Sequence, residues 1–212
     1  MSVLNRIAAF QGRRDEAPNQ ELARELAAAR DSEGIREIAV NLWHKDKNIH
    51  SDCLKVLYEI GYLDPELIAP YVADFIKLLQ SSNNRMVWGS LIALATITPL
   101  QSTVIYGHVT EIQRLMQTGT VITIDNGVKI LASLAAGNPE RNRRLFPYLI
   151  KHLETCRNGD VPRHAEYMLP AVNARNQDQF SRVLQTRMQG MSGAQMTRIR
   201  KVLKRFLPDA RR

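Results

Sequence analysis

The feature that most constrains the fold is an internal repeat of 37 residues. Six columns of residues spaced by this period are apolar in each of four successive units. One column holds Ile38, Phe75, Ile112 and Leu149, and another holds Leu57, Leu94, Leu131 and Met168. Apolar residues make up 44% of the chain, so six such columns are hard to obtain by chance. A repeat of this length is typical of a unit that buries its apolar face by stacking on copies of itself.

Within one unit the apolar residues are spaced as on a helix. Val72, Phe75 and Leu79 lie three and four residues apart, and a second stripe with a spacing of three follows the polar turn 81–84. The alternation with period two that a strand requires is absent. Each unit is therefore predicted to be a pair of helices joined by a short turn. The predicted units are 34–63, 64–99, 100–137, 138–174 and 175–208.

The repeat changes at both ends of the chain. Residues 19–30 are predicted to form a capping helix, and residues 1–18 an N-terminal segment that is partly mobile. The fifth pair, at 177–189 and 193–207, is out of register, as expected for a terminal repeat with one face in water. Asp64-Pro65 and Asn138-Pro139 are typical of helix starts, with an N-cap followed by proline. The sequence predicts an all-α fold in which 19–212 form a single domain of about five stacked helix pairs.

Residues 67–97 resemble a HEAT repeat, a close relative of the armadillo repeat. The residues that match the HEAT pattern are Pro70, Leu78-Leu79, Asn83 or Asn84, Ser90, Ala93, Leu94 and Ile97. The chain departs from this pattern at Met86-Val87, where the family often has Val-Arg. Pro70 is replaced by Gly107 and Arg144 in later units. The resemblance covers residues 34–173 and implies a right-handed α-solenoid.

The resemblance also implies that the second helix of each unit lines a concave face. Such a face suits a long ligand, such as a helix, a peptide or a nucleic-acid backbone. The residues expected on this face are Lys55, Trp88, Asp125, Lys129, Arg163 and Glu166. The leading hypothesis is a non-enzymatic scaffold that binds a protein or peptide partner there.

The positive charge is placed very unevenly. The net charge is +8, yet residues 1–138 carry 13 basic and 15 acidic side chains, and residues 139–212 carry 16 and 6. The basic end has one of two roles: it is a solubilising cap, or it binds nucleic acid or another anionic partner through backbone contacts. The candidate anion-binding residues are Arg141, Arg143, Arg144, Arg198, Lys201, Lys204 and Arg205.

Motifs for catalysis, cofactors and metals are missing from the sequence. There is no phosphate-binding glycine motif, no HExxH and no CxxC, and the two cysteines, Cys53 and Cys156, lie far apart, so no cofactor and no metal site is expected. Cys53 shares a column with Ser90, Gly127 and His164; this column is small in three of the four units, so Cys53 is predicted to be a packing residue. An enzymatic alternative remains, because DNA glycosylases for alkylated bases are also built from HEAT-like helix pairs. This resemblance would give a role to Trp88, Asp125 and Arg163.

The remaining expectations concern location and assembly. No segment approaches the roughly 18 apolar residues of a membrane span, and no basic leader precedes an apolar stretch. A cytoplasmic protein is therefore expected. The oligomeric state is not predicted.

Overall fold

The computed structural model describes residues 2–206, and all regular secondary structure within them is helical. Contacts divide the chain into two compact units, Met1–Gly127 (unit 1) and Val128–Arg212 (unit 2). The prediction of an all-α fold is confirmed.

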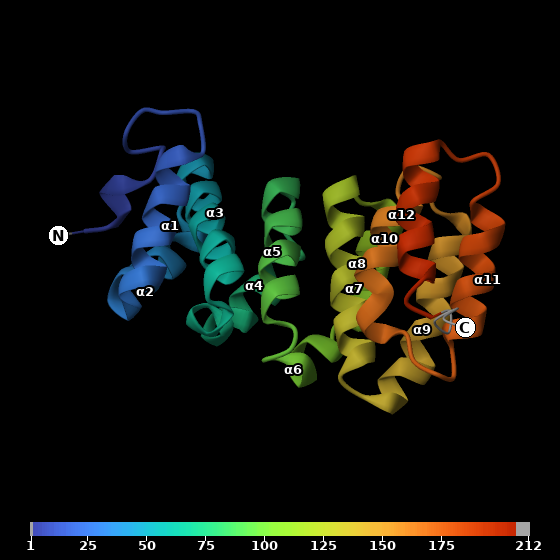
Figure 1. Ribbon diagram of the computed structural model, residues 1–212. Helices are drawn as coiled ribbons and strands as arrows, with labels where there is room; N and C mark the ends of the chain where they lie inside the picture. The colour runs from blue at the N-terminus through green and yellow to red at the C-terminus, as the bar shows by residue number, and fades with distance from the viewer. Residues whose placement is uncertain (1, 207–212) are drawn as a thin grey trace. The chain divides into compact units, whose positions relative to one another are not determined.

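Unit 1 places α1 and the second helices of its pairs side by side (Figure 1). Helix α3 packs against α1, α2 and α5, and α4 packs against α5. Helix α1 covers the end of this row, at the position predicted for a capping helix. The elements are η1 (Leu4–Arg6), α1 (Ala17–Ala29), α2 (Ser32–Val40), η2 (Asn41–Trp43), α3 (Lys47–Leu63), η3 (Pro65–Leu67), η4 (Ala69–Tyr71), α4 (Val72–Leu78), α5 (Asn84–Ile97), α6 (Ser102–Tyr106) and α7 (Val109–Thr118).

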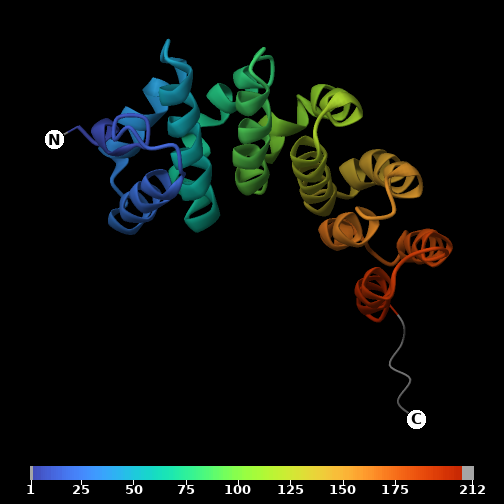
Figure 2. The same ribbon diagram turned by 90° about the horizontal axis from the view of Figure 1, so that it is seen from above.

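Unit 2 repeats the same arrangement, with its later helices seen nearly end-on in Figure 2. Helix α10 packs against α9, α11 and α12, and α11 packs against α9. The fifth predicted pair is present as α11 and α12, and the predicted end of its second helix, Leu207, lies outside the described residues. The elements are α8 (Val121–Ala136), which begins in unit 1, α9 (Pro139–Thr155), α10 (Val161–Met168), η5 (Leu169–Ala171), α11 (Gln177–Arg187) and α12 (Gly193–Leu203).

Polar side chains fix where several helices begin. The side chains of Asp46, Asn83 and Asn138 accept hydrogen bonds from backbone N–H groups in the first turns of α3, α5 and α9. Each such cap contributes about 1 kcal/mol. The predicted N-cap positions of Asn138 and Asp64, each followed by proline, are confirmed. The Asp64 side chain accepts no capping hydrogen bond, and its carboxylate pairs with Arg30.

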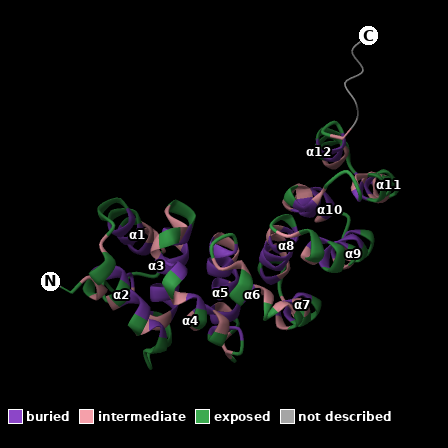
Figure 3. Cartoon of the chain, turned by 90° about the horizontal axis from the view of Figure 1, so that it is seen from below, coloured by how far each residue is buried: buried purple, intermediate pink, exposed green. Residues whose placement is uncertain are grey.

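The repeat columns form the core of each unit. Ile38, Phe75, Ile112 and Leu149 are all 0% exposed, and so is Cys53, which confirms its packing position. Figure 3 shows the buried residues on the sides where helices of the same unit face one another. Burying a side chain of this size contributes about 1.5–3 kcal/mol. The apolar stripes are therefore the main stabilising feature, and they leave the opposite faces of the helices to polar residues.

Candidate functional site

Lys55, predicted to face a partner, is buried in unit 1 and paired within the chain. Its side chain is 7% exposed, and its Nζ atom lies 2.8 Å from Glu16 Oε2 and 2.7 Å from Glu59 Oε1. Its ammonium group also lies 4.9 Å from the centre of the Tyr58 ring. Burial alone would lower the pKa of Lys55, but its hydrogen bonds to Glu16 and Glu59 raise the pKa above the usual value. The ammonium group is therefore charged and occupied.

Trp88 belongs to a group of three aromatic rings on α3 and α5, which we call the aromatic row: Tyr58, Tyr62 and Trp88. The centre of the Tyr58 ring lies 6.3 Å from that of Tyr62 and 6.4 Å from that of Trp88. Tyr58 is buried, Trp88 is half-buried and Tyr62 is 55% exposed. Arg85, one turn before Trp88, reaches Glu16 with its Nη2 atom at 3.2 Å. The row thus offers flat apolar surface beside charged groups.

In unit 2 the predicted residues of successive second helices contact their neighbours in pairs. Lys129 Nζ, on α8, lies 4.7 Å from the centre of the Tyr167 ring on α10. Glu166, also on α10, accepts two hydrogen bonds from Arg198 on α12, at 2.9 and 2.6 Å. We call these four residues the charged row. All except Arg198 are half-buried, and the side chain of Arg198 is 48% exposed.

Arg163 and Asp125 are not part of the charged row. Arg163 Nη2 lies 2.7 Å from Asp160 Oδ1, and Arg157 pairs with the other oxygen of the same carboxylate at 2.8 Å. Burial would raise the pKa of Asp160, but the hydrogen bond from Arg157 and the charges of Arg157 and Arg163 hold it below the usual value. Asp125 is half-buried near the start of α8, in unit 1. Trp88 and Asp125 thus lie in unit 1 and Arg163 in unit 2, so the proposed glycosylase-like trio stays an untested expectation.

The predicted anion-binding residues are partly engaged with carboxylates. Arg198 pairs with Glu166, and Arg144 pairs with Glu140 at 2.9 Å. Arg141 is half-buried. The remaining four, which are exposed, are Arg143, Lys201, Lys204 and Arg205.

Two hollows bring the two basic clusters to the same turn of unit 2. One, of about 600 Å³, is lined by Arg143 and Arg175 and by Pro170 of η5. The other, of about 360 Å³, is lined by Lys201 and Arg205 and again by Pro170. We call these four cations the basic rim. The α9 and α12 clusters, which are separate in sequence, therefore border one turn, Leu169–Ala171.

A network of three asparagines, of which Asn142 and Asn176 are buried, holds this turn. The Asn142 side chain donates to the carbonyl oxygens of Ala135 and Ala171, at 3.1 and 2.8 Å. Its oxygen accepts from the side chains of Asn173 and Asn176, at 3.3 and 3.1 Å. All the hydrogen-bonding capacity of a buried amide is used. The network fixes the backbone from which Arg143 and Arg175 project.

Sequence reasoning did not single out the tyrosines of either row, or Arg175. Tyr58 and Tyr62 lie on the same face of one helix as Lys55, three and seven residues after it, which was an available signal. Tyr167 gave no such signal, because it meets Lys129 only through the packing of α10 beside α8. Sequence reasoning also did not single out a group of two histidines and a cysteine in unit 2, His152, His164 and Cys156, whose donor atoms lie within 4.8 Å of one another.

Within residues 2–206, no helix is both long enough and apolar enough to cross a membrane.

Comparisons with known proteins identify the fold. No protein-family profile matches the sequence, and no curated protein matches it. Among solved structures, a designed armadillo repeat protein in complex with the peptide (KR)4 is similar with a TM-score of 0.67 and 15% identity, over 89% of this chain and 87% of that one. Two engineered proteins are similar with TM-scores of 0.65 and 0.66 and identities of 19% and 17%. The first match covers 96% of both chains, and the second covers 96% of this chain and 98% of the other. The fold is that of an armadillo- or HEAT-like helical repeat solenoid.

Proposed function

We propose that this armadillo-like repeat protein is a non-enzymatic scaffold that binds an extended segment of a partner protein along the exposed face of its second helices. The observation that carries the proposal is the pair of rows described above. In each unit, aromatic rings and charged groups continue from one second helix to the next. Rings beside cations and carboxylates offer stacking, apolar contact and hydrogen bonding together. One of the similar designed proteins holds a peptide, which is compatible with such a use of the fold.

The ion pairs within the rows favour a peptide over a small ligand. The Glu166–Arg198 pair is exposed enough to exchange partners at little cost, because pairs of this kind contribute only about 0–1 kcal/mol. Trp88 and Tyr62 keep surface in water that a partner would cover. Within each unit, a linear segment can contact the groups of the row in turn, because successive side chains of an extended chain are spaced along its length.

Selection from a displayed library of random peptides tests this proposal, with the full chain as bait. We expect enriched peptides whose affinity falls at least tenfold in Trp88→Ala or Arg198→Glu. The matched controls are Trp43→Ala and Arg182→Glu, which change exposed residues of η2 and α11 outside the second helices. Peptides that bind all four variants equally well, or no enrichment at all, would contradict the proposal.

The basic rim favours a second candidate function, the binding of nucleic acid through its phosphates. Four cations around one turn supply the charge that phosphate contacts need. The rim lacks an aromatic ring among the residues that line the Lys201–Arg205 hollow, so contacts to the backbone are expected rather than base stacking.

A mobility-shift assay at low and moderate salt tests the second candidate. We expect retardation of duplex DNA or RNA that weakens with salt, and a loss of affinity of about tenfold or more in the double variant Lys201→Glu/Arg205→Glu. Arg24→Glu/Arg114→Glu is the control, since it reverses two exposed charges in unit 1. An equal loss of affinity in both double variants would show that binding depends only on net charge, and it would contradict a role for the basic rim.

A further inference from the structure

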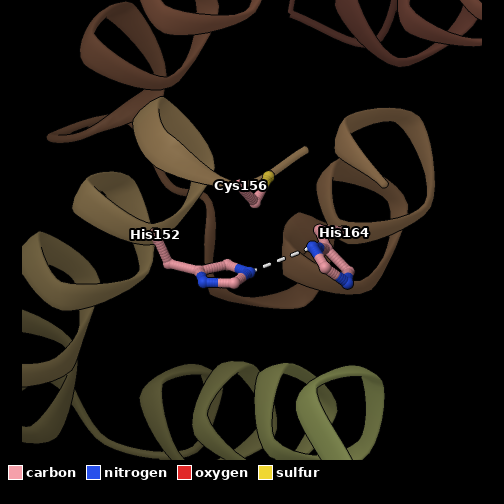
Figure 4. Close-up of side chains that lie close together, drawn as sticks. All are labelled: His152, Cys156 and His164. Carbon is pink, nitrogen blue, oxygen red and sulfur yellow. Dashed lines mark hydrogen bonds between the residues drawn. The ribbon is translucent and has the colours of Figure 1, made fainter. Parts of the chain in front are cut away.

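The turn between α9 and α10 gathers three side chains of the types that bind transition metals (Figure 4). His152 and Cys156 come from the last turn of α9 and its C-cap, four residues apart, so they project from the same side of the helix end. His164 comes from the first turns of α10. His152 Nε2 and His164 Nδ1 lie 3.0 Å apart, and one donor atom from each of the three residues lies within 4.8 Å of the others.

The position of His164 is unusual for this repeat. The equivalent residues of the other three units are Cys53, Ser90 and Gly127, which are small and allow helices to pack closely. His164 fills the same column with a ring and is only 1% exposed. Its Nδ1 atom points to His152. His152 and Cys156 are half-buried, so the group is accessible from the solvent on their side. The fourth repeat therefore buries a polar ring where a small residue would suffice for packing.

The distances fit a tetrahedral ion with modest adjustment. Zinc bonds of about 2.0–2.1 Å to nitrogen and about 2.3 Å to sulfur place tetrahedral ligands roughly 3.3–3.6 Å apart. The two imidazole nitrogens need to separate by only a few tenths of an ångström from 3.0 Å. To bind the same ion, the Cys156 sulfur leaves its 3.7 Å contact with the carbonyl oxygen of Leu153 and moves closer to the imidazoles than the 4.8 Å within which the donor atoms now lie. Three protein ligands leave a fourth position for water or for a donor from a partner.

The charged side chains around the turn are compatible with a zinc ion bound to a thiolate. Arg157 and Arg163 are both paired with Asp160, which lies between Cys156 and His164 in the chain. Arg187, from α11, donates to the carbonyl oxygens of Glu154 and Cys156 and to Asn158 Oδ1 at 2.8 Å. These guanidinium groups are thus directed to oxygen acceptors. Burial raises the pKa of the Cys156 thiol to about 11, so the thiol stays protonated at neutral pH unless a metal displaces the proton.

We propose that His152, Cys156 and His164 bind one zinc ion. Binding replaces the hydrogen bond between the two imidazoles by two Zn–N bonds, and the proton shared in that bond moves through solvent to the other ring nitrogen of the histidine that carried it. The thiol proton is released to solvent as the Zn–S bond forms. The ion then joins the end of α9 to the start of α10 and stabilises the fourth repeat. This site is independent of the proposed function, because none of its three ligands belongs to either row or to the basic rim.

Titration of the full chain with Co²⁺, after treatment with a chelator and its removal, tests the site directly. Cobalt substitutes for zinc in such sites and reports a bound thiolate through a sulfur-to-cobalt charge-transfer absorption. We expect this absorption to saturate at one equivalent and to disappear when Zn²⁺ is added. Zn²⁺ is also expected to raise the Tm of the protein by several degrees, because a ligand that binds the folded state stabilises it.

Variants separate the three ligands from adventitious binding. Cys156→Ser is expected to abolish the charge-transfer absorption and to weaken zinc binding at least tenfold, and His152→Ala to weaken zinc binding similarly. His108→Ala, which changes an exposed histidine in unit 1, is the control and should bind as the unmodified protein does. Less than half an equivalent of cobalt bound by the folded unmodified chain would overturn the proposal, and so would unchanged zinc affinity in Cys156→Ser. The first of these outcomes does not depend on whether any variant folds.

Discussion

Units 1 and 2 are built from the same helix pairs but place their charged side chains in different ways. Residues 1–127 carry 12 basic and 15 acidic side chains, whereas residues 128–212 carry 17 and 6. In unit 1 the carboxylate of Glu16 lies between Lys55 and Arg85 and joins α1 to the two helices beside it. In unit 2 the basic side chains outnumber the acidic ones, and the basic rim faces the solvent.

This difference shows that charged side chains have two roles in a stacked repeat: they fix the packing of helices, or they stay available for a partner. A buried cation with two carboxylates fixes how neighbouring helices sit, and its removal leaves the half-buried carboxylate of Glu59 without that cation. Exposed cations contribute little to stability, since water and salt screen them. The surplus in unit 2 is therefore available for a partner at low structural cost. The following predictions test this contrast.

The largest effect is expected at Lys55. Lys55→Met should lower the free energy of unfolding by about 2–4 kcal/mol, because the half-buried Glu59 loses its cation and Glu16 keeps only Arg85. Urea unfolding followed by circular dichroism measures this. Lys204→Met, in unit 2, is the control and should change stability by less than about 0.5 kcal/mol. Adding Glu59→Gln to Lys55→Met should recover part of the loss. Similar losses for Lys55→Met and Lys204→Met would remove the distinction between the units.

Lys55 also shows what the sequence could and could not predict. The apolar columns and the helix pairs follow from local spacing, and they are correct because stacking rewards the same stripe in every repeat. The rotation of each helix and the reach of distant side chains do not follow from spacing. Lys55 is covered by Glu16, which precedes it by 39 residues, so no pattern within one repeat could reveal the pairing.

The candidate sites show the same limit. Glu166 and Lys129 are expected on one face because the HEAT resemblance places the second helices there. Their actual contacts, to Arg198 and to the Tyr167 ring, depend on how second helices pack side by side. His152 and His164 are twelve residues apart and meet only because the chain reverses between them. Which face binds a partner therefore stays a prediction, and the contacts on that face could not be predicted from the sequence.

A smaller difference is expected between two buried asparagines. Asn142 in unit 2 makes four side-chain hydrogen bonds. Asn19 in unit 1 accepts one, from the backbone N–H of Ala8, and its amide nitrogen has no partner within the described residues. Asn142→Ala should therefore cost about 2–3 kcal/mol of unfolding free energy and Asn19→Ala about 1 kcal/mol. Urea unfolding of both variants provides the measurement, and a larger loss for Asn19→Ala would contradict the ranking.

The Asn142 substitution has a second consequence. Because the network fixes the turn that the basic rim borders, Asn142→Ala should also weaken any phosphate binding by the rim, although it removes no charge. Asn19→Ala should leave that binding unchanged. A loss of stability without a loss of binding in Asn142→Ala would show that the rim does not depend on the network.

The smallest effect, one of rate rather than stability, concerns the two cysteines, one in each unit. Burial raises the pKa of Cys53 to about 12 and that of Cys156 to about 11. Because the thiolate is the reactive form, about one Cys156 in a thousand is reactive at pH 8, against roughly a quarter for an unperturbed cysteine. Alkylation of Cys156 by iodoacetamide should be slow at pH 8 and accelerate about tenfold per pH unit up to pH 10. Peptide mass spectrometry measures the rate at each cysteine.

Cys53 supplies the internal control for this experiment, because it is 0% exposed whereas Cys156 is half-buried. Alkylation of Cys53 should require unit 1 to open. Its rate should therefore depend more on the stability of that unit than on the pH. Lys55→Met should speed alkylation of Cys53, which lies on the same helix, and leave Cys156 unaffected. A chelator in all samples keeps bound metal from protecting Cys156. If Lys55→Met accelerated the alkylation of both cysteines equally, the two units would open together. The difference between the paired charges of unit 1 and the surface charges of unit 2 would then not correspond to a difference in stability between the units.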